Sequence, residues 1–179
     1  MLEGEEKLIK SIQGGETHLF GQLYDHYLPK IYRFVLLKVG QKEESEDIVH
    51  DVFINAWQNL GTYSSKGFPF SSWLYHIARN KVIDYYRLKK PTTHLEDLDD
   101  SFVKVASNAE KLFDINLDLE KVKSAIQKLT PEQQDVVIMK FVEDLTHQEI
   151  AAALNKSEGA VRLLQHRAIN NLKNLLTAV

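Results

Sequence analysis

The chain has 179 residues, a length that allows one domain or two small ones. Hydrophobic residues make up 44% of it and charged residues 26%, which is typical of a globular protein and excludes wholesale disorder. It contains no cysteine, so disulfides, thiolate nucleophiles and cysteine-ligated zinc are excluded. No apolar run approaches about 20 residues and the first ten residues are acidic. We therefore expect no membrane insertion, no signal peptide and a cytoplasmic location.

The net charge of −3 is unevenly distributed along the chain. Residues 1–90 are close to neutral at +1, residues 91–120 carry −6, and residues 121–179 carry +2. The middle segment opens with Pro91 and lacks a long apolar face, so it is predicted to be an acidic linker between two domains. The whole-chain charge therefore does not argue against nucleic-acid binding by the flanking parts.

Residues 19–35 carry apolar side chains at spacings of three and four, which predicts an amphipathic helix. Pro29 stands inside this run and should kink or split it. A second helix is predicted after Gly40 and should end at Gly61, with one apolar side and one strongly acidic side. The acidic side is either a solvated face or a docking site for a basic partner. It consists of Glu43, Glu44, Glu46, Asp47 and Asp51.

A loop containing Gly67 and Pro69 is followed by a third predicted helix, Ser71–Leu88. Residues 63–90 hold seven of the seventeen aromatic residues of the chain, interleaved with Lys and Arg. This combination suits unpaired nucleic-acid bases, which stack on rings while cations contact the phosphates. Any one of these aromatic residues is explained equally well as core, but their combination with a Gly/Pro loop favours nucleic acid.

The C-terminal part contains two capping boxes, one starting at Thr130 with Pro131 in the first helical position and one starting at Thr146. A short turn then leads into a longer helix at Ser157–Leu176, which is the helix-turn-helix pattern. An apolar stripe on this helix leaves the opposite face for the DNA major groove, where Arg can bond a guanine edge. A solvated surface helix is the alternative interpretation. The exposed face is expected to hold Gly159, Arg162, Leu163, His166, Asn170 and Lys173, with Gln165 and Arg167 on its flanks.

The seven histidines show no metal-ligand spacing, and no phosphate-binding or nucleophile motif is present. The sequence therefore predicts no catalytic residue, no metal and no cofactor. It predicts an all-α protein of two small helical domains joined by an acidic linker, the C-terminal one a helix-turn-helix. The expected ranges are 1–90, 91–120 for the linker, and 121–179.

Two pairs of segments resemble a known family. EDIVHDVFINAW (46–57) and FSSWLYHIARNKVIDYYR (70–87) resemble region two of bacterial RNA polymerase sigma factors. LTPEQQDVVIMKF (129–141) and LTHQEIAAALNKSEGAVRLLQHRAINNLK (145–173) resemble region four. The short length, with no domain between the two regions, is similar to the extracytoplasmic-function (ECF, group IV) class. The resemblance implies a non-catalytic promoter-specificity subunit that binds core polymerase, recognises two promoter elements and is controlled by an anti-sigma factor.

The resemblance also implies roles for individual residues. Region two would dock on the clamp helices of the polymerase through Asp47, His50 and Asp51. Region four would meet the polymerase flap, and the holoenzyme would be associated with the nucleoid. The specificity loop, residues 63–70, and the helix after it would capture and read the melted minus-ten element. The residues implied there are Ser65, Lys66, Phe68, Trp73, His76, Arg79, Asn80, Asp84 and Arg87. Those implied for the duplex minus-thirty-five element are Ser157, Glu158, Gly159, Arg162, Leu163, His166, Arg167 and Lys173.

Two other functions fit the residues less well. A stand-alone helix-turn-helix regulator with a helical sensor or dimerisation domain would need no polymerase and would bind a palindromic site. An interaction protein that mimics a sigma factor could lose its DNA-facing cations, whereas Arg79, Arg87, Arg162 and Arg167 are all present here.

Overall fold

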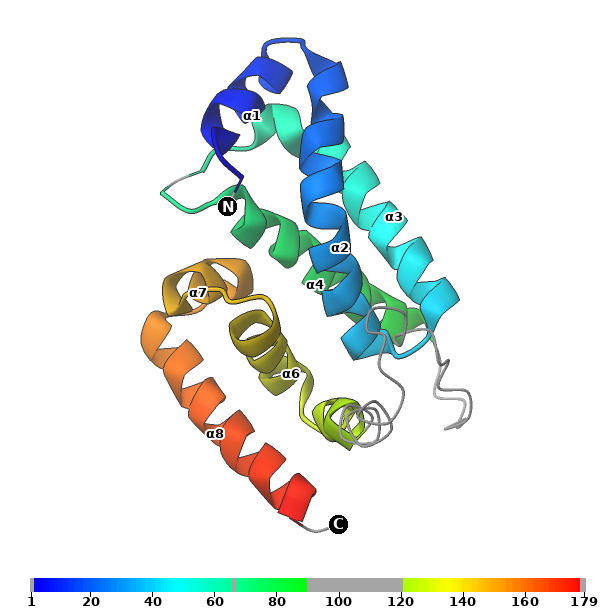
Figure 1. Cartoon of the computed structure of the whole chain (residues 1–179), viewed down its shortest axis with the longest axis vertical. Coiled ribbons are helices and arrows are strands. Elements are labelled where there is room, and N and C mark those ends of the chain that lie inside the picture. Colours follow the sequence, from blue (N-terminus) through cyan, green and yellow to red (C-terminus); the bar gives the residue numbers. More distant parts are fainter. Residues whose placement is uncertain (1, 66, 90–120, 178–179) are drawn as a thin grey trace, which may run out of the picture.

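The computed structural model describes residues 2–65, 67–89 and 121–177, and within these ranges the chain forms helices and no strand. The all-α prediction is confirmed for this part of the chain. The predicted acidic linker, 91–120, lies outside the described residues. Figure 1 shows an N-terminal bundle, α1 to α4, beside a smaller group of C-terminal helices.

The N-terminal bundle is built from α1 (Glu5–Gln13), α2 (Phe20–Val39), α3 (Lys42–Asn59) and α4 (Phe70–Leu88). Helices α2, α3 and α4 pack against one another around a core of fully buried apolar side chains. Short 3₁₀ turns at Thr17–Leu19 and Leu60–Thr62 precede α2 and follow α3. The core includes Leu23, Ile31, Phe34, Val35, Val52, Ala56, Leu74 and Ala78.

Pro29 does not split α2, which runs without a break through this residue. Tyr27 and Ile31, on either side of it, are 1% and 0% exposed. Burial of both halves of the helix in one core outweighs the loss of one hydrogen bond at the proline. The second predicted helix ends slightly earlier than expected: α3 ends at Asn59, and Gly61 lies in the 3₁₀ turn that follows.

The C-terminal helices begin with helical residues 121–127 and continue with α6 (Pro131–Val137), a π-helical segment (Ile138–Val142), α7 (His147–Leu154) and α8 (Glu158–Thr177). Both predicted capping boxes are formed, at Thr130 and at Thr146. Asn155 ends α7 in the left-handed conformation, with φ 53°. Because the turn is this tight, α7 and α8 pack against each other, and the predicted helix-turn-helix is confirmed.

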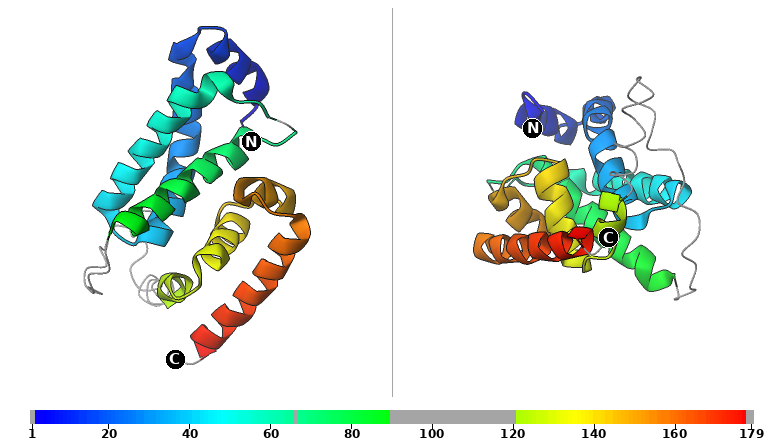
Figure 2. Two further views of the ribbon diagram at one scale, coloured as in Figure 1. Left: turned by 180° about the vertical axis from the view of Figure 1, so that it is seen from behind. Right: turned by 60° about the horizontal axis from the view of Figure 1, so that its bottom comes forward.

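The two groups of helices are in contact. Helix α7 packs on α4, and the π-helical segment touches α2, whereas α8 lies on the far side of α6 and α7 (Figures 1 and 2). Gly40, which ends α2 with φ 81°, lies so close to Gln127 that an added Cβ would come within 2.7 Å of its Nε2. Among the described helices, this contact surface covers part of α4, whereas α3 and the outer face of α8 lie outside it.

Candidate nucleic-acid interface

The acidic side of α3 is open on the surface of the N-terminal bundle. Asp47, His50 and Asp51 are all exposed there. Asp51 accepts from Lys81 of α4 at 3.2 Å, in an ion pair whose two side chains are both accessible to water. Such pairs contribute little stability, about 0–1 kcal/mol. All three residues are therefore available to a partner without loss of the fold.

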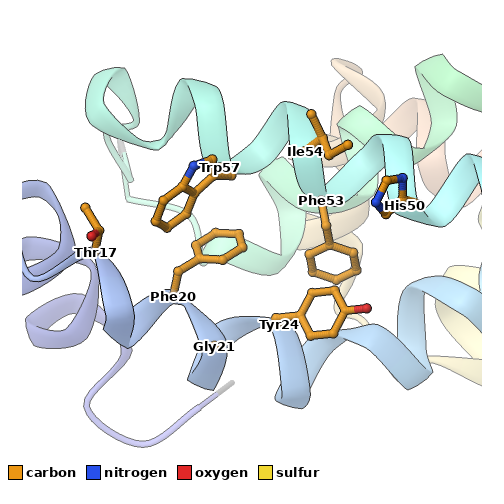
Figure 3. Close-up of a pocket in the computed structure, with 8 residues that line it drawn as sticks. All are labelled: Thr17, Phe20, Gly21, Tyr24, His50, Phe53, Ile54 and Trp57. Carbon is orange, nitrogen blue, oxygen red and sulfur yellow. The ribbon is translucent and has the colours of Figure 1, made fainter.

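An apolar pocket lies next to this acidic side, between the start of α2 and the end of α3 (Figure 3). Its volume is about 400 Å³, and Trp57, Ile54 and Tyr24 remain 43%, 41% and 36% exposed. Two edge-to-face ring pairs, each with centroids 4.8 Å apart, build its wall. No sequence pattern predicted this pocket, although residues 50, 54 and 57 follow one another at spacings of four and three, which places them on one side of the helix. It is lined by Thr17, Phe20, Gly21, Tyr24, His50, Phe53, Ile54 and Trp57.

The described residues of the predicted specificity loop include a tight turn. Gly67 adopts φ 84°, a conformation that favours glycine, and Phe68 N–H donates to the Ser65 carbonyl at 2.7 Å. Ser65 and Phe68 are half-buried, and Lys66 lies outside the described residues. Trp73 packs against the rings of Tyr63 and Phe70, with centroids 4.9 and 5.4 Å away. Trp73 therefore supports the loop by packing on these rings, in addition to offering a surface on which a base could stack.

The predicted DNA-reading face of α4 is partly occupied by the C-terminal helices. His76 Nδ1 lies 2.9 Å from the carbonyl of Ala153 in α7, and its Nε2 lies 3.1 Å from Asn80 Nδ2. Arg79 donates from Nε to Asp135 of α6 at 2.9 Å. Further along the helix, Asp84 and Arg87 are exposed and pair with each other at 3.3 Å. The structure thus divides the predicted minus-ten residues of α4 into a covered group and an open group.

Asp135 joins the two groups of helices. Its carboxylate is 1% exposed and accepts from Lys38 of α2 at Oδ1 and from Arg79 of α4 at Oδ2. The Lys38 side chain is 2% exposed. Burial lowers the pKa of Lys38, and the neighbouring carboxylate opposes that shift. Nothing in the sequence pointed to this cluster, since Lys38 and Asp135 are separated by 97 positions.

A second ion pair links the same two groups. Arg33 of α2 makes a two-pronged contact with Glu143, with N–O distances of 2.7 and 2.9 Å. The Glu143 side chain is 1% exposed, and this hydrogen bonding raises the pKa of Arg33. Planar, two-pronged Arg–carboxylate pairs are geometrically specific. They therefore fix one orientation of the C-terminal helices on α2.

The predicted face of α8 is open along its length. Ser157 caps the helix by accepting from the Ala160 N–H at 3.2 Å, and Val161 and Ala168 point into the core. Leu163 is 50% exposed, and Arg162 lies 3.5 Å from Glu158 in an exposed pair. The other residues predicted for this face and its flank that are also exposed are Gly159, His166, Arg167, Asn170 and Lys173. The predicted division of α8 into a core side and a surface side is confirmed.

Among residues 2–65, 67–89 and 121–177 no group of three or more His, Asp and Glu side chains is arranged to hold a metal ion. Within the same ranges, none of the helices has both the length and the apolar character that crossing a membrane requires. The surfaces described above are thus the candidates for function in this part of the chain.

Comparisons with known proteins match both halves of the chain. The family model for Sigma-70 region 2 matches residues 23–92, and that for Sigma-70, region 4 matches residues 125–174. The ECF RNA polymerase sigma factor BldN of Streptomyces coelicolor is 34% identical over 95% of this chain, which spans 65% of the length of BldN. The ECF RNA polymerase sigma factor SigW of Bacillus subtilis is 29% identical, with 96% of each chain covered.

Two solved structures share the fold. CnrH, in complex with the cytosolic domain of CnrY, aligns with a TM-score of 0.75 at 24% identity over 98% of both chains. The sigma factor RpoE of Bartonella quintana, in complex with the anti-sigma factor NepR, aligns with a TM-score of 0.72 at 22% identity, covering 88% of this chain and 96% of that one. At these identities the likeness concerns the fold.

Proposed function

Since the chain belongs to the sigma-70 family of RNA polymerase sigma factors, in its ECF class, we propose that it binds bacterial core RNA polymerase and directs initiation at promoters with two elements. It contributes recognition and strand capture, while catalysis stays with the polymerase. Residues 1–90 form the polymerase-docking and minus-ten domain, 91–120 the linker and 121–179 the minus-thirty-five domain. The observation that carries the proposal is the match to both regions in one chain, in this order.

The polymerase contact is assigned to α3. Asp47, His50 and Asp51 would face the clamp helices, and the adjoining pocket with Ile54 and Trp57 would receive apolar side chains of the same partner. An apolar centre with a charged rim is the usual composition of a protein interface, and a half-exposed tryptophan is a common anchor in it. The open position of this surface, away from the contact between the helix groups, supports the assignment.

The minus-ten element is assigned to the specificity loop and α4. Ser65, Lys66 and Phe68 would surround a base that has left the stack, while the α4 residues from Trp73 to Arg87 follow the melted strand. Because His76 and Arg79 are engaged by α7 and α6, they can reach DNA only after the two groups of helices separate. The packed arrangement is therefore the resting form of the free protein in this proposal.

The minus-thirty-five element is assigned to α8, inserted into the major groove of duplex DNA. Arg162, Leu163 and His166 would contact base edges near the start of the helix, and Arg167 and Lys173 would contact phosphates. Ser157, Glu158 and Gly159 at the first turn would face the same element. This domain would also meet the polymerase flap.

Control by an anti-sigma factor is part of the proposal. RpoE of Bartonella quintana, which has the same fold, is bound by such a partner. An inhibitor that stabilises the packed arrangement would keep α4 covered and the protein inactive. The protein would act in the cytoplasm, and on the nucleoid once it is part of the holoenzyme.

The proposal is tested by mixing the purified protein with bacterial core polymerase, isolating the complex by gel filtration and transcribing a randomised promoter library. We expect a stable complex and a selected motif of two blocks, and core polymerase alone provides the control. A folded protein that shows no affinity for core polymerase would overturn the proposal and favour a stand-alone regulator.

A further inference from the structure

Helix α1 holds the specificity loop at its beginning. The side-chain amide of Gln13, at the end of α1, donates from Nε2 to the carbonyl oxygens of Leu60 and Tyr63, at 2.9 and 2.8 Å. These carbonyls belong to the 3₁₀ turn after α3 and to the first residue of the loop. Both hydrogens of one amide are thus used to fix the point where the chain leaves α3.

The same helix holds the other end of the loop through Glu5. The Glu5 side chain is buried, and its carboxylate accepts from the Phe70 N–H at 3.1 Å and from the Tyr27 hydroxyl. Phe70 is the first residue of α4, and Pro69 before it provides no side-chain cap. Glu5 therefore supplies from another helix the acceptor and the negative charge that the start of α4 lacks.

Between these two attachments the loop stands away from α1. A pocket of about 340 Å³ separates them, lined on one side by α1 and on the other by loop residues including Ser65 and Phe68. Burial raises the pKa of Tyr63 to about 12, and the carboxylates of Glu5 and Glu6 act in the same direction. The loop is supported by the Trp73 ring, which packs on Tyr63, whereas its hydrogen bonds to α1 lie at its two ends.

We propose that α1 sets the position of the specificity loop, with Glu5 and Gln13 as positioning residues that fasten its two ends. The inference rests on the proposed function, in which this loop captures an unpaired base. A loop that is already fixed loses little conformational entropy when the base enters, so preorganisation converts directly into affinity. Residues more than fifty positions before α4 thereby contribute to promoter opening without touching DNA.

The test uses full-length protein in complex with core polymerase and a promoter fork whose minus-ten strand is unpaired. An abasic site is moved along that strand with the unchanged protein, and the position with the largest loss of affinity defines the captured base. The measured quantity is the ratio of the two dissociation constants, abasic over intact. This ratio is insensitive to general charge effects and to the amount of folded protein.

Gln13→Met preserves length and removes the donors, Gln13→Lys restores donors of similar reach, and Gln22→Met on an exposed position of α2 is the matched control. We expect Gln13→Met to lower the ratio about tenfold, the size of one stacked base, with Gln13→Lys and Gln22→Met near the unchanged value. Glu5→Gln should lower the ratio as well. Thermal melting monitored by circular dichroism accompanies each variant.

A Gln13→Met protein that melts normally and keeps the full ratio would overturn the role of α1 while leaving base capture intact. If the unchanged protein shows no loss at any abasic position, base capture itself fails, and the inference about α1 fails with it. An equal drop for Gln13→Met and Gln13→Lys would also count against the proposal, because the donors would then not be what matters.

Discussion

The contact between the two groups of helices can be weakened at Asp135. Replacing it by Asn keeps the shape of the side chain and removes the negative charge that Lys38 and Arg79 share. Lys38 is then left as a buried cation without a counter-charge in the packed arrangement. When the two groups of helices separate, position 135 and Lys38 are exposed to water. The substitution therefore lowers the stability of the packed arrangement and leaves that of the separated arrangement unchanged.

The expected magnitude follows from the burial of the pair. Removing one partner of a buried ion pair costs about 3–5 kcal/mol. Asn retains one acceptor oxygen, so we take the lower end, about 3 kcal/mol, which is about a hundredfold change in the ratio of packed to separated protein. Glu132→Gln on the same helix is the control, since its pair with Lys156 is partly exposed and worth at most about 1 kcal/mol.

The chain has no cysteine, so two introduced cysteines can carry a pair of fluorophores without further changes. Gln58→Cys on α3 and Asn170→Cys on α8 are exposed positions in the two groups. Energy transfer is followed across a urea titration, with helical circular dichroism recorded in parallel. For Asp135→Asn we expect transfer to be lost at lower urea than in the unchanged protein, well before the helical signal is lost.

Identical transfer curves for Asp135→Asn and the unchanged protein would refute the reasoning, because the buried cluster would then not hold the two groups together. The same conclusion would follow if Glu132→Gln lowered the urea concentration at which energy transfer is lost as much as Asp135→Asn does. A positive result has a functional consequence. The separated variant should bind forked promoter DNA more tightly in the absence of polymerase, since Arg79 is released.

Three further predictions concern other surfaces. Changing Asp47 and Asp51 to Arg should weaken binding to core polymerase and leave the melting temperature nearly unchanged, which gel filtration and calorimetry measure; normal binding would remove α3 from the interface. Arg162→Ala should cost about 1–3 kcal/mol and relax promoter selection at one base position; an unchanged selected motif would place the reading face elsewhere. His26 has a lowered pKa because of burial and Lys30, whose Nζ lies 3.3 Å from its ring. Stability should therefore fall as the pH drops below about 6.5, where the unfolded chain takes up the proton first. In thermal melts at several pH values, His26→Gln should reduce this dependence of the melting temperature on pH. An unchanged pH dependence would mean that other groups cause it.

Local patterns in the sequence determined much of the fold. The capping boxes at Thr130 and Thr146 formed as expected because each links groups three residues apart. The stripe containing Val161 and Ala168 correctly gave the buried side of α8, because a helix repeats its faces every three to four residues. The exposed face of α8 and the acidic side of α3 follow from the same periodicity, whereas the docking role of Asp47, His50 and Asp51 came from the resemblance to sigma factors.

Tertiary structure decided what such patterns cannot contain. Pro29 was expected to kink or split the helix, and the burial of Tyr27 and Ile31 on both sides keeps α2 unsplit. Whether Asp135 is a surface acid or a buried link depends on residues 56 and 97 positions away. Glu5 likewise accepts the Phe70 N–H only because the start of α4 lies next to it in the folded chain.

The sequence by itself thus determined the helices, their caps and their exposed faces, because these depend on neighbours within about one helical turn. The packing of α7 over His76 and of α6 over Arg79, the apolar pocket beside α3 and the attachment of the specificity loop to α1 were decided only by the tertiary structure. Each of them joins groups that are far apart in the sequence, and the distance between these groups in space is set by how the helices pack.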